Sequence, residues 1–419
     1  MQDSPSESQQ NPSQQPAQRK AVFSCKYLIS GALMVAILAA TMLLLFRNLS
    51  WQDVKQTILS ARPAYLLAGF GMMLVYQLCI ALSIRTLIRT FTGGHCSLGL
   101  SATAAFIGFY FNNITPSASG GQPMEMYYLN RRGINLSHSS MIFILLAIFY
   151  NITIIGAALI MLVWRYDLIR SSLGYIRYFM YFGLSFHLIA TVLMVLLVVR
   201  PRIVRETMKA VSALLFKLRL IRNQSVYLRK VVTFSSGYRQ NSAVLFKQPR
   251  LLLRLLVLHI FQVLSFYSVP YLVTRSFGGR SRMYLDSLAL QSVLYISSSA
   301  VPTPGAVGIT ESGFVTMFAS ILPPHLVVPA MLLTRIIQLY GFLILSAVIT
   351  IAALFRVNHG RTPAPPADGQ TVGKDPMADA ELPGNADWPA GGELPGNGYA
   401  PGSAGSSDCR LRFEPDETE

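Results

Sequence analysis

The stretch Pro116-Ser-Ala-Ser-Gly-Gly-Gln-Pro-Met-Glu125 interrupts an apolar part of the chain, and Pro302-Thr-Pro-Gly-Ala-Val-Gly-Ile-Thr-Glu311 interrupts another. In each break a glutamate stands nine positions after a proline. Backbone broken by Pro and Gly is tolerated at membrane depth only where protein or water satisfies its polar groups. A carboxylate at that depth is costly unless it lines a cavity or is paired. The two breaks therefore predict a two-part polar site inside a membrane protein.

Composition indicates the same class of protein. Hydrophobic residues make up 52% of the chain and charged residues 13%. Apolar runs of about twenty residues can span ~30 Å of hydrocarbon, and shorter apolar pieces at Ser97–Ile114 and Tyr284–Leu322 flank the two breaks. We expect an all-α polytopic membrane protein with about six to eight transmembrane helices. The long runs are Tyr27–Phe46, Ala64–Ile84, Met141–Val163, Tyr178–Val199, Leu255–Val273 and Val327–Phe355.

The two ends of the chain differ from this body. Residues 1–19 are rich in Gln, Ser and Pro, and residues 357–419 are rich in Pro, Gly and acids. Such segments bury too little apolar surface to offset the entropy of ordering, so we expect both to be disordered around an integral membrane domain at residues 20–356. The first run, Tyr27–Phe46, is too long for a signal peptide and lacks a cleavage site, so we expect it to remain as an anchor.

Cysteine and histidine do not indicate a metal site. The four cysteines have neither paired spacing nor a Cys-x-x-Cys motif. His187 and His259 fall inside predicted spans, where an imidazole satisfied by hydrogen bonds is more common than a metal ligand. We expect neither a metal nor another cofactor.

Positive charge is concentrated in residues 200–250, where Glu206 is the only acid among twelve lysines and arginines. The tail from residue 357 carries seven more acids than bases, so the rest of the chain has a net charge of +23 rather than +16. Nucleic-acid binding is one interpretation of this cluster, but no aromatic-interleaved module accompanies it, and we expect no nucleic-acid partner. Cationic loops between spans stay on the cytoplasmic side, so we expect this loop and both termini there.

The side of the membrane on which the basic loop lies indicates whether the chain crosses the membrane at the first break or turns back there. If Ser97–Ile114 crossed fully, the basic loop would lie outside; if the chain turns back at the first break, the loop lies inside. The second break could dip in from the opposite face, or both of its arms could cross. Two broken elements that enter from opposite faces form an inverted repeat, in which half-helix ends meet near the midplane at a substrate site.

The breaks also predict a local chemistry. Their glycines permit positive φ and their prolines fix the backbone. Helices expected from Met124 and Ile309 would offer free N–H groups at their N-termini, which suit a phosphate. Glu125 and Glu311 would lie in the first turns, either as ligands or as helix caps. Arg335 lies ~15 Å into the last apolar run, where snorkelling is awkward, so we expect it to pair with Glu311 or to contact a lipid phosphate.

Three strings resemble a known family. Asn112-Asn-Ile-Thr-Pro-Ser-Ala-Ser-Gly-Gly-Gln-Pro-Met-Glu-Met-Tyr-Tyr-Leu-Asn-Arg-Arg-Gly133 and Pro302-Thr-Pro-Gly-Ala-Val-Gly-Ile-Thr-Glu-Ser-Gly-Phe314 resemble two signatures of the lysylphosphatidylglycerol synthase transmembrane region, or flippase-like domain, family. Leu333-Thr-Arg335 with Tyr340 resembles its Arg-containing helix, and the resemblance runs from about Lys26 to Phe355. It implies movement of aminoacylated phospholipid to the outer leaflet. The family's lipid synthesis belongs to a soluble domain, so we expect a stand-alone member that does not synthesise lipid.

We therefore expect a multi-pass protein of the bacterial inner membrane that binds and translocates a polar or aminoacylated phospholipid, or another lipid-linked substrate. One alternative is a lipid transferase with a glutamate as general base, for which the sequence shows no nucleophile. Another is a partner subunit whose basic loop docks a separate synthase. Changing either glutamate to glutamine is expected to abolish transport and leave insertion intact. The expected headgroup-binding residues are Glu125, Glu311, Arg335, Pro116, Gly120, Gly121, Pro304, Gly305, Gly308, Asn113 and Arg131.

Overall fold

The computed structural model describes residues 51–200, 248–279 and 283–359, together with isolated residues between 202 and 210. Every element in these residues is a helix. The expected disordered ends, the run Tyr27–Phe46 and most of the basic loop lie outside the described residues. The all-α fold is confirmed for the part of the chain that the structure describes.

Five helices are long and apolar enough to cross a membrane, counted over the described residues. Each extends a predicted apolar run at one or both ends. For example, α3 continues past Ile84 because its helical pattern ends only at Gly93, which takes the left-handed conformation (φ 62°) common at helix C-termini. The five are α3 (Pro63–Thr92), α6 (Leu136–Trp164), α8 (Ile176–Val199), α11 (Pro249–Ser276) and the run Pro324–Val357. This last run is built of α14 (Pro324–Arg335), the π-helical η4 (Ile336–Tyr340) and α15 (Gly341–His359).

Both Pro/Gly breaks are the tips of helical hairpins. The first hairpin consists of α4 (Leu98–Ile114), η1 (Pro116–Ala118) and α5 (Gly121–Arg131). The second consists of α12 (Tyr284–Ser299), η3 (Pro304–Ala306) and α13 (Ile309–Phe318). In each hairpin the two arms pack against each other, and the tips η1 and η3 are in contact. The chain therefore turns back at both breaks, which resolves the alternative left open for the second.

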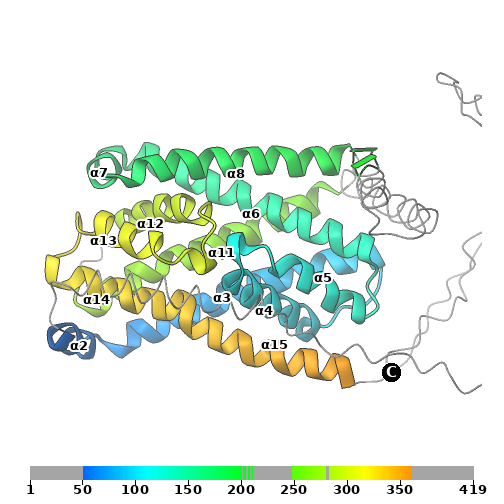
Figure 1. Cartoon of the computed structure of the whole chain (residues 1–419), viewed down its shortest axis with the longest axis horizontal. Helices are drawn as coiled ribbons and strands as arrows, with labels where there is room; N and C mark the ends of the chain where they lie inside the picture. The colour runs from blue at the N-terminus through cyan, green and yellow to red at the C-terminus, as the bar shows by residue number, and fades with distance from the viewer. Residues whose placement is uncertain are drawn as a thin grey trace, which may run out of the picture. The chain divides into compact units, whose positions relative to one another are not determined.

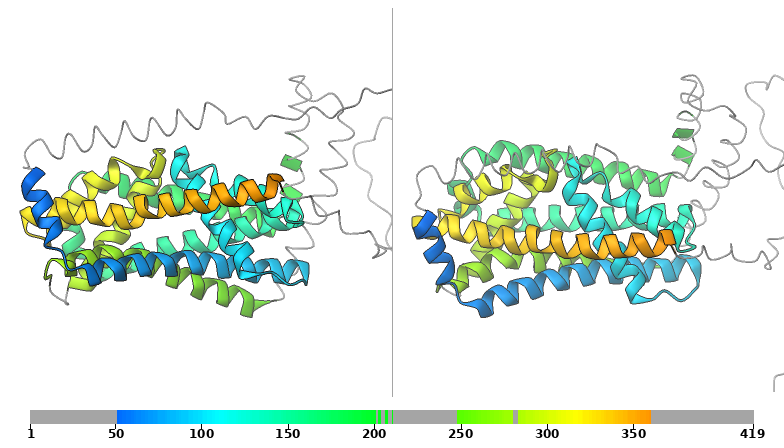
Figure 2. Two further views of the ribbon diagram at one scale, coloured as in Figure 1. Left: turned by 90° about the horizontal axis from the view of Figure 1, so that it is seen from below. Right: turned by 60° about the horizontal axis from the view of Figure 1, so that its bottom comes forward.

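The two hairpins enter the helical body from opposite ends (Figure 1). The first follows α3 and precedes α6; the second follows α11 and precedes α14. Helices α3 and α11 pack closely along each other and run in opposite directions (Figure 2). The order long helix, hairpin, long helix thus occurs twice with reversed direction, which is the inverted repeat expected from the sequence. Helix α8 lies outside this repeat and packs on α6 and α12. Short helices α2 (Trp51–Leu59) and α7 (Tyr166–Ser172) complete the described part.

Each hairpin has its own apolar core. Phe314 and Phe318 of the second hairpin stack with ring centroids 3.9 Å apart inside one cluster. Ile107 and Leu129, from the two arms of the first hairpin, belong to another. The apolar packing is thus divided mainly between the two hairpins.

Candidate functional site

The two tips begin in the same way, although Gly308 has φ 94° where Gly120 has φ −88°. Thr115 and Thr303 are extended (φ −108° and −106°), and a proline follows each and begins a short 3-10 turn. Each turn ends on an alanine with positive φ, 52° at Ala118 and 51° at Ala306. The structural equivalent of Pro116 is therefore Pro304, not the Pro302 suggested by equal spacing to the glutamates. Glu125 lies nine residues after Pro116, whereas Glu311 lies only seven residues after Pro304.

This offset gives Glu311 a capping role. It lies in the first turn of α13, as expected, and its Oε2 accepts the Gly308 N–H at 2.7 Å. Its Oε1 accepts a hydrogen bond from Arg335 Nε at 2.6 Å, so the pairing predicted from the sequence is confirmed. Arg335 Nη2 also donates to the Gly305 carbonyl at 3.0 Å. Glu311 is fully buried and Arg335 is 7% exposed. The pair therefore fastens the tip of the second hairpin to α14.

Glu125 has no such role, which corrects the expectation that it lies in a first turn. Helix α5 begins at Gly121, not at Met124, so Glu125 stands one turn further in and cannot cap the helix start. Its carboxylate packs directly over Gly108 of α4, where a Cβ would collide with Oε1. Glu125 is 6% exposed, and no hydrogen bond or ion pair joins it to another described residue. Its carboxylate is buried and unpaired.

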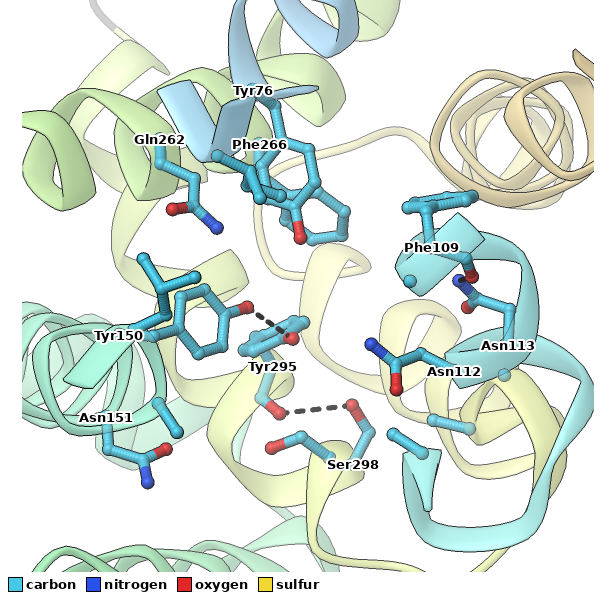
Figure 3. A pocket seen from close by; sticks show the side chains of 18 of the residues that line it. Tyr76, Phe109, Asn112, Asn113, Tyr150, Asn151, Gln262, Phe266, Tyr295 and Ser298 are labelled. Carbon is cyan, nitrogen blue, oxygen red and sulfur yellow. Dashed lines mark hydrogen bonds between the residues drawn. The ribbon is translucent and has the colours of Figure 1, made fainter. Parts of the chain in front are cut away.

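A cavity of about 490 Å³ lies between the tips, lined by both hairpins and by α3, α6, α8, α11, α14 and η4. Amide side chains enter it from different elements, with Asn112 and Gln262 directed toward its centre (Figure 3). Tyr150 donates a hydrogen bond to the Tyr295 hydroxyl at 2.5 Å. The Phe266 ring packs against Tyr295, with centroids 5.3 Å apart. The interior thus combines amides, hydroxyls and aromatic rings, a lining suited to a polar group with some apolar surface.

The cavity opens sideways. Among its lining residues, Ala118 and Gln122 of the first tip and Phe186 of α8 are exposed. Phe186 lies near the middle of α8 and is 48% exposed. An opening flanked by the tip of a hairpin and the middle of a long helix faces the side of the helical body rather than one of its ends.

Both interior histidines have hydrogen-bond partners, as expected. His187 Nδ1 lies 3.1 Å from Asn151 Oδ1, and its Nε2 lies 2.8 Å from Ser299 Oγ. His259 Nδ1 donates to the Leu255 carbonyl at 2.7 Å. Among the described residues, no group of three or more His, Cys, Asp or Glu side chains could hold a metal ion.

The structure brings together only some of the residues predicted to bind a headgroup. Glu125, Arg335, Gly305 and Asn113 line the cavity, whereas Glu311 lies behind Arg335. Arg131 does not line this cavity: it is exposed at the far end of α5, with its guanidinium 5.4 Å from the Tyr127 ring centroid.

The remaining predicted residues shape the tips. Gly120 donates its N–H to Thr115 Oγ1 at 2.9 Å, and Gly121 leaves room for the Asn112 amide. Gly308 has φ 94°, a conformation that favours glycine. Pro116 is exposed at one tip and Pro304 is buried at the other.

Sequence reasoning missed most of the polar lining. Tyr76, Tyr150 and Gln262 lie on three different helices, and no local motif in the sequence marks them as members of one site. One signal was present on α12, where polar residues recur at the spacing of a single helical face and all line the cavity. These residues are Gln291, Tyr295, Ser298 and Ser299.

Comparison with known families agrees with this architecture. The model of the lysylphosphatidylglycerol synthase transmembrane region matches residues 29–346, a span that includes both hairpins and all the cavity-lining residues. Comparison with curated proteins gives no match. Because the family match covers most of the chain, the protein belongs to the lysylphosphatidylglycerol synthase transmembrane region family.

Proposed function

We propose that this multi-pass membrane protein binds and translocates a polar lipid, either an aminoacylated phospholipid or another lipid-linked substrate, in the bacterial inner membrane with both termini cytoplasmic. The observation that carries the proposal is the buried carboxylate of Glu125, which has no partner among the described residues and lies in a cavity between two hairpin tips. Ionisable groups inside membrane segments are expensive and usually serve substrate or ion pathways.

The sideways opening fits a lipid. A headgroup can enter past Phe186 and Gln122 while its acyl chains stay in the surrounding hydrocarbon. A water-soluble substrate has no need of an opening at this position. The apolar surface of α8 around the opening, including Leu193 at 56% exposed, is compatible with lipid tails.

The two charged residues of the cavity differ in how many of their polar atoms are available to a headgroup. Glu125 offers a free acceptor for a cationic or hydroxylated part of the headgroup. Arg335, expected either to pair with Glu311 or to contact a phosphate, donates Nε to the Glu311 carboxylate and Nη2 to the Gly305 carbonyl. The proposal therefore assigns headgroup recognition chiefly to Glu125 and a supporting role to Arg335.

The same asymmetry suggests which element moves. The second tip is held by a buried ion pair and a capping bond, whereas the start of α5 has no side-chain cap. Rocking one repeat against the other would expose the cavity alternately, as in other inverted-repeat transporters. In this proposal the first hairpin carries Glu125 and the headgroup, and the second is the fixed wall.

Lipid translocation in reconstituted vesicles tests the proposal. The assay compares phosphatidylglycerol, an aminoacylated phosphatidylglycerol and a glycosylated lipid. We expect the native protein to move at least one of them and Glu125→Gln to lose at least about 90% of that rate, because the amide keeps the shape and removes the charge. Asp286→Asn is the matched control, since Asp286 lies outside the cavity in a partly exposed ion pair with Arg165. Equal rates for Glu125→Gln and the native protein would contradict the role of Glu125. No movement of any lipid would favour the partner-subunit or transferase alternative.

A further inference from the structure

Three polar side chains from different helices form a connected row on one wall of the cavity. Ser299 stands at the end of α12, His187 on α8 and Asn151 on α6. Ser299 Oγ lies 2.8 Å from His187 Nε2, and His187 Nδ1 lies 3.1 Å from Asn151 Oδ1. All three line the cavity that contains Glu125. The proposed translocation assigns no role to this row.

The hydrogen bonds define one protonation state. With Asn151 Oδ1 as acceptor, the hydrogen of the imidazole lies on Nδ1, and Nε2 keeps its lone pair toward Ser299. The imidazole is 8% exposed and has no carboxylate partner among the described residues, so burial favours its neutral form, in which Nε2 carries a lone pair. A hydroxyl bonded to a base that is itself oriented by a third group is the arrangement used in nucleophilic catalysis. An asparagine serves as the orienting group in Cys-His-Asn enzymes.

Neighbouring serines on α12 lack this arrangement. Ser297 Oγ donates to the Val293 carbonyl at 2.7 Å, and Ser298 Oγ lies 3.3 Å from the Tyr295 carbonyl. Such bonds to the preceding turn are the ordinary way in which serine is accommodated in an apolar helix. Ser299 lies 3.5 Å from the corresponding Ile296 carbonyl and is much closer to the imidazole.

We propose that Ser299 is a nucleophile toward carboxylic esters of lipids that enter the cavity, an activity separate from translocation. Ser299 Oγ attacks the ester carbonyl and His187 Nε2 takes the hydroxyl proton. When the carbon–oxygen bond of the ester breaks, the leaving alkoxide takes that proton, and an acyl group remains on Ser299. A water or hydroxyl acceptor then gives its proton to His187 Nε2 and attacks the acyl carbonyl. The bond between the acyl carbon and Ser299 Oγ breaks, and His187 returns the proton to Oγ. The net reaction is ester hydrolysis or transfer of the acyl group between hydroxyls.

The cavity offers a donor for the developing oxyanion. The Asn112 amide points into the cavity from the first hairpin (Figure 3). Side-chain amides serve this purpose in other acyl-transfer sites. Asn112 and Ser299 belong to different hairpins, so the relative position of the hairpins would set the distance between donor and nucleophile.

Covalent labelling of the purified full chain in detergent tests the proposal. Short-chain and long-chain fluorophosphonates phosphonylate activated serines, and peptide mass spectrometry identifies the site. We expect labelling on Ser299, none in Ser299→Ala, and a rate about 100-fold lower in His187→Gln, in keeping with the loss of a general base. Ser297→Ala is the matched control and should label like the native protein, because Ser297 lies outside the cavity on the same helix.

Asn151 is a positioning residue and has its own test. Asn151→Leu should lower the labelling rate, and Asn151→Asp should restore it. A carboxylate oxygen of the aspartate can accept the same Nδ1 hydrogen, whereas leucine has no acceptor. Equal labelling rates in the native protein and in both variants would show that Asn151 does not position the imidazole.

The outcomes separate this proposal from the transport proposal. Folded protein that neither fluorophosphonate labels, or equal labelling of native protein and His187→Gln, overturns the nucleophile and leaves translocation untouched. Labelling of Ser299 in a protein that moves no lipid would keep the nucleophile and overturn the transporter. Thermal unfolding of each variant confirms that it is folded before labelling.

Discussion

Glu311→Gln should destabilise the protein strongly although it changes one atom. The glutamine oxygen can still accept the Gly308 N–H, so the start of α13 keeps its cap. Arg335, however, is left as a cation that is 7% exposed and retains only the Gly305 carbonyl among its present partners. Removing one member of a buried ion pair costs about 3–5 kcal/mol, because the other charge remains without compensation. We therefore revise the expectation that this substitution affects transport alone.

A second substitution in the same pair isolates the cause. Arg335→Met alone strands the Glu311 carboxylate and should also cost about 3–5 kcal/mol. The double variant Glu311→Gln/Arg335→Met contains no buried charge at this place. It loses the bond to Gly305, worth about 1 kcal/mol, and some packing. Its cost should therefore be smaller than that of either single variant and far below their sum.

Equilibrium unfolding in mixed micelles, followed by helical circular dichroism as denaturing detergent is added, measures these differences. The measurement is repeated at low and high salt, because a buried pair is little screened and its contribution should persist. Native stability in Glu311→Gln would refute the reasoning. So would a double variant whose cost equals the sum of the singles, since that would show that the two charges act independently.

Four further substitutions test the hairpins. Gly108→Ala should displace the Glu125 carboxylate, lowering the initial lipid-translocation rate in native protein and having no further effect in Glu125→Ala. Ala118→Gly and Ala306→Gly should each stabilise the protein to unfolding by about 0.5–1 kcal/mol, because both alanines have positive φ. Gly308→Ala should lower the thermal unfolding midpoint, because φ 94° is strained for any residue with a Cβ.

The fold could be predicted because its signals are local. Long apolar runs define α3, α6, α8 and α11, and each break contains the proline and glycines that stop a helix. The charge of the loop at residues 200–250 favoured a first hairpin that turns back, as observed. The equivalence of the breaks was misjudged because Pro302 and Pro304 are both present, and only the backbone angles show that Pro304 begins the turn.

The site was less predictable because it is assembled from distant helices. Glu125 and Arg335 could be singled out as charges in apolar surroundings. The contacts of Tyr150 with Tyr295, and of His187 with Asn151 and Ser299, depend on helix rotation and tilt. Those quantities are set by packing between helices, and a single polar residue on each helix carries no information about them.

The repeated order of elements with unequal glutamates has a consequence for reconstitution. Each half has a long helix, a hairpin and a second long helix, so a molecule inserted upside down presents the same order of elements to the bilayer. Its free carboxylate would then belong to the hairpin that enters from the other leaflet. A vesicle preparation with mixed insertion therefore contains molecules in two opposite orientations. If each population moves lipid in its own direction, the net lipid flux can be zero although both populations are active. Protease protection of one terminus would count the two populations and recover the sidedness of the molecule.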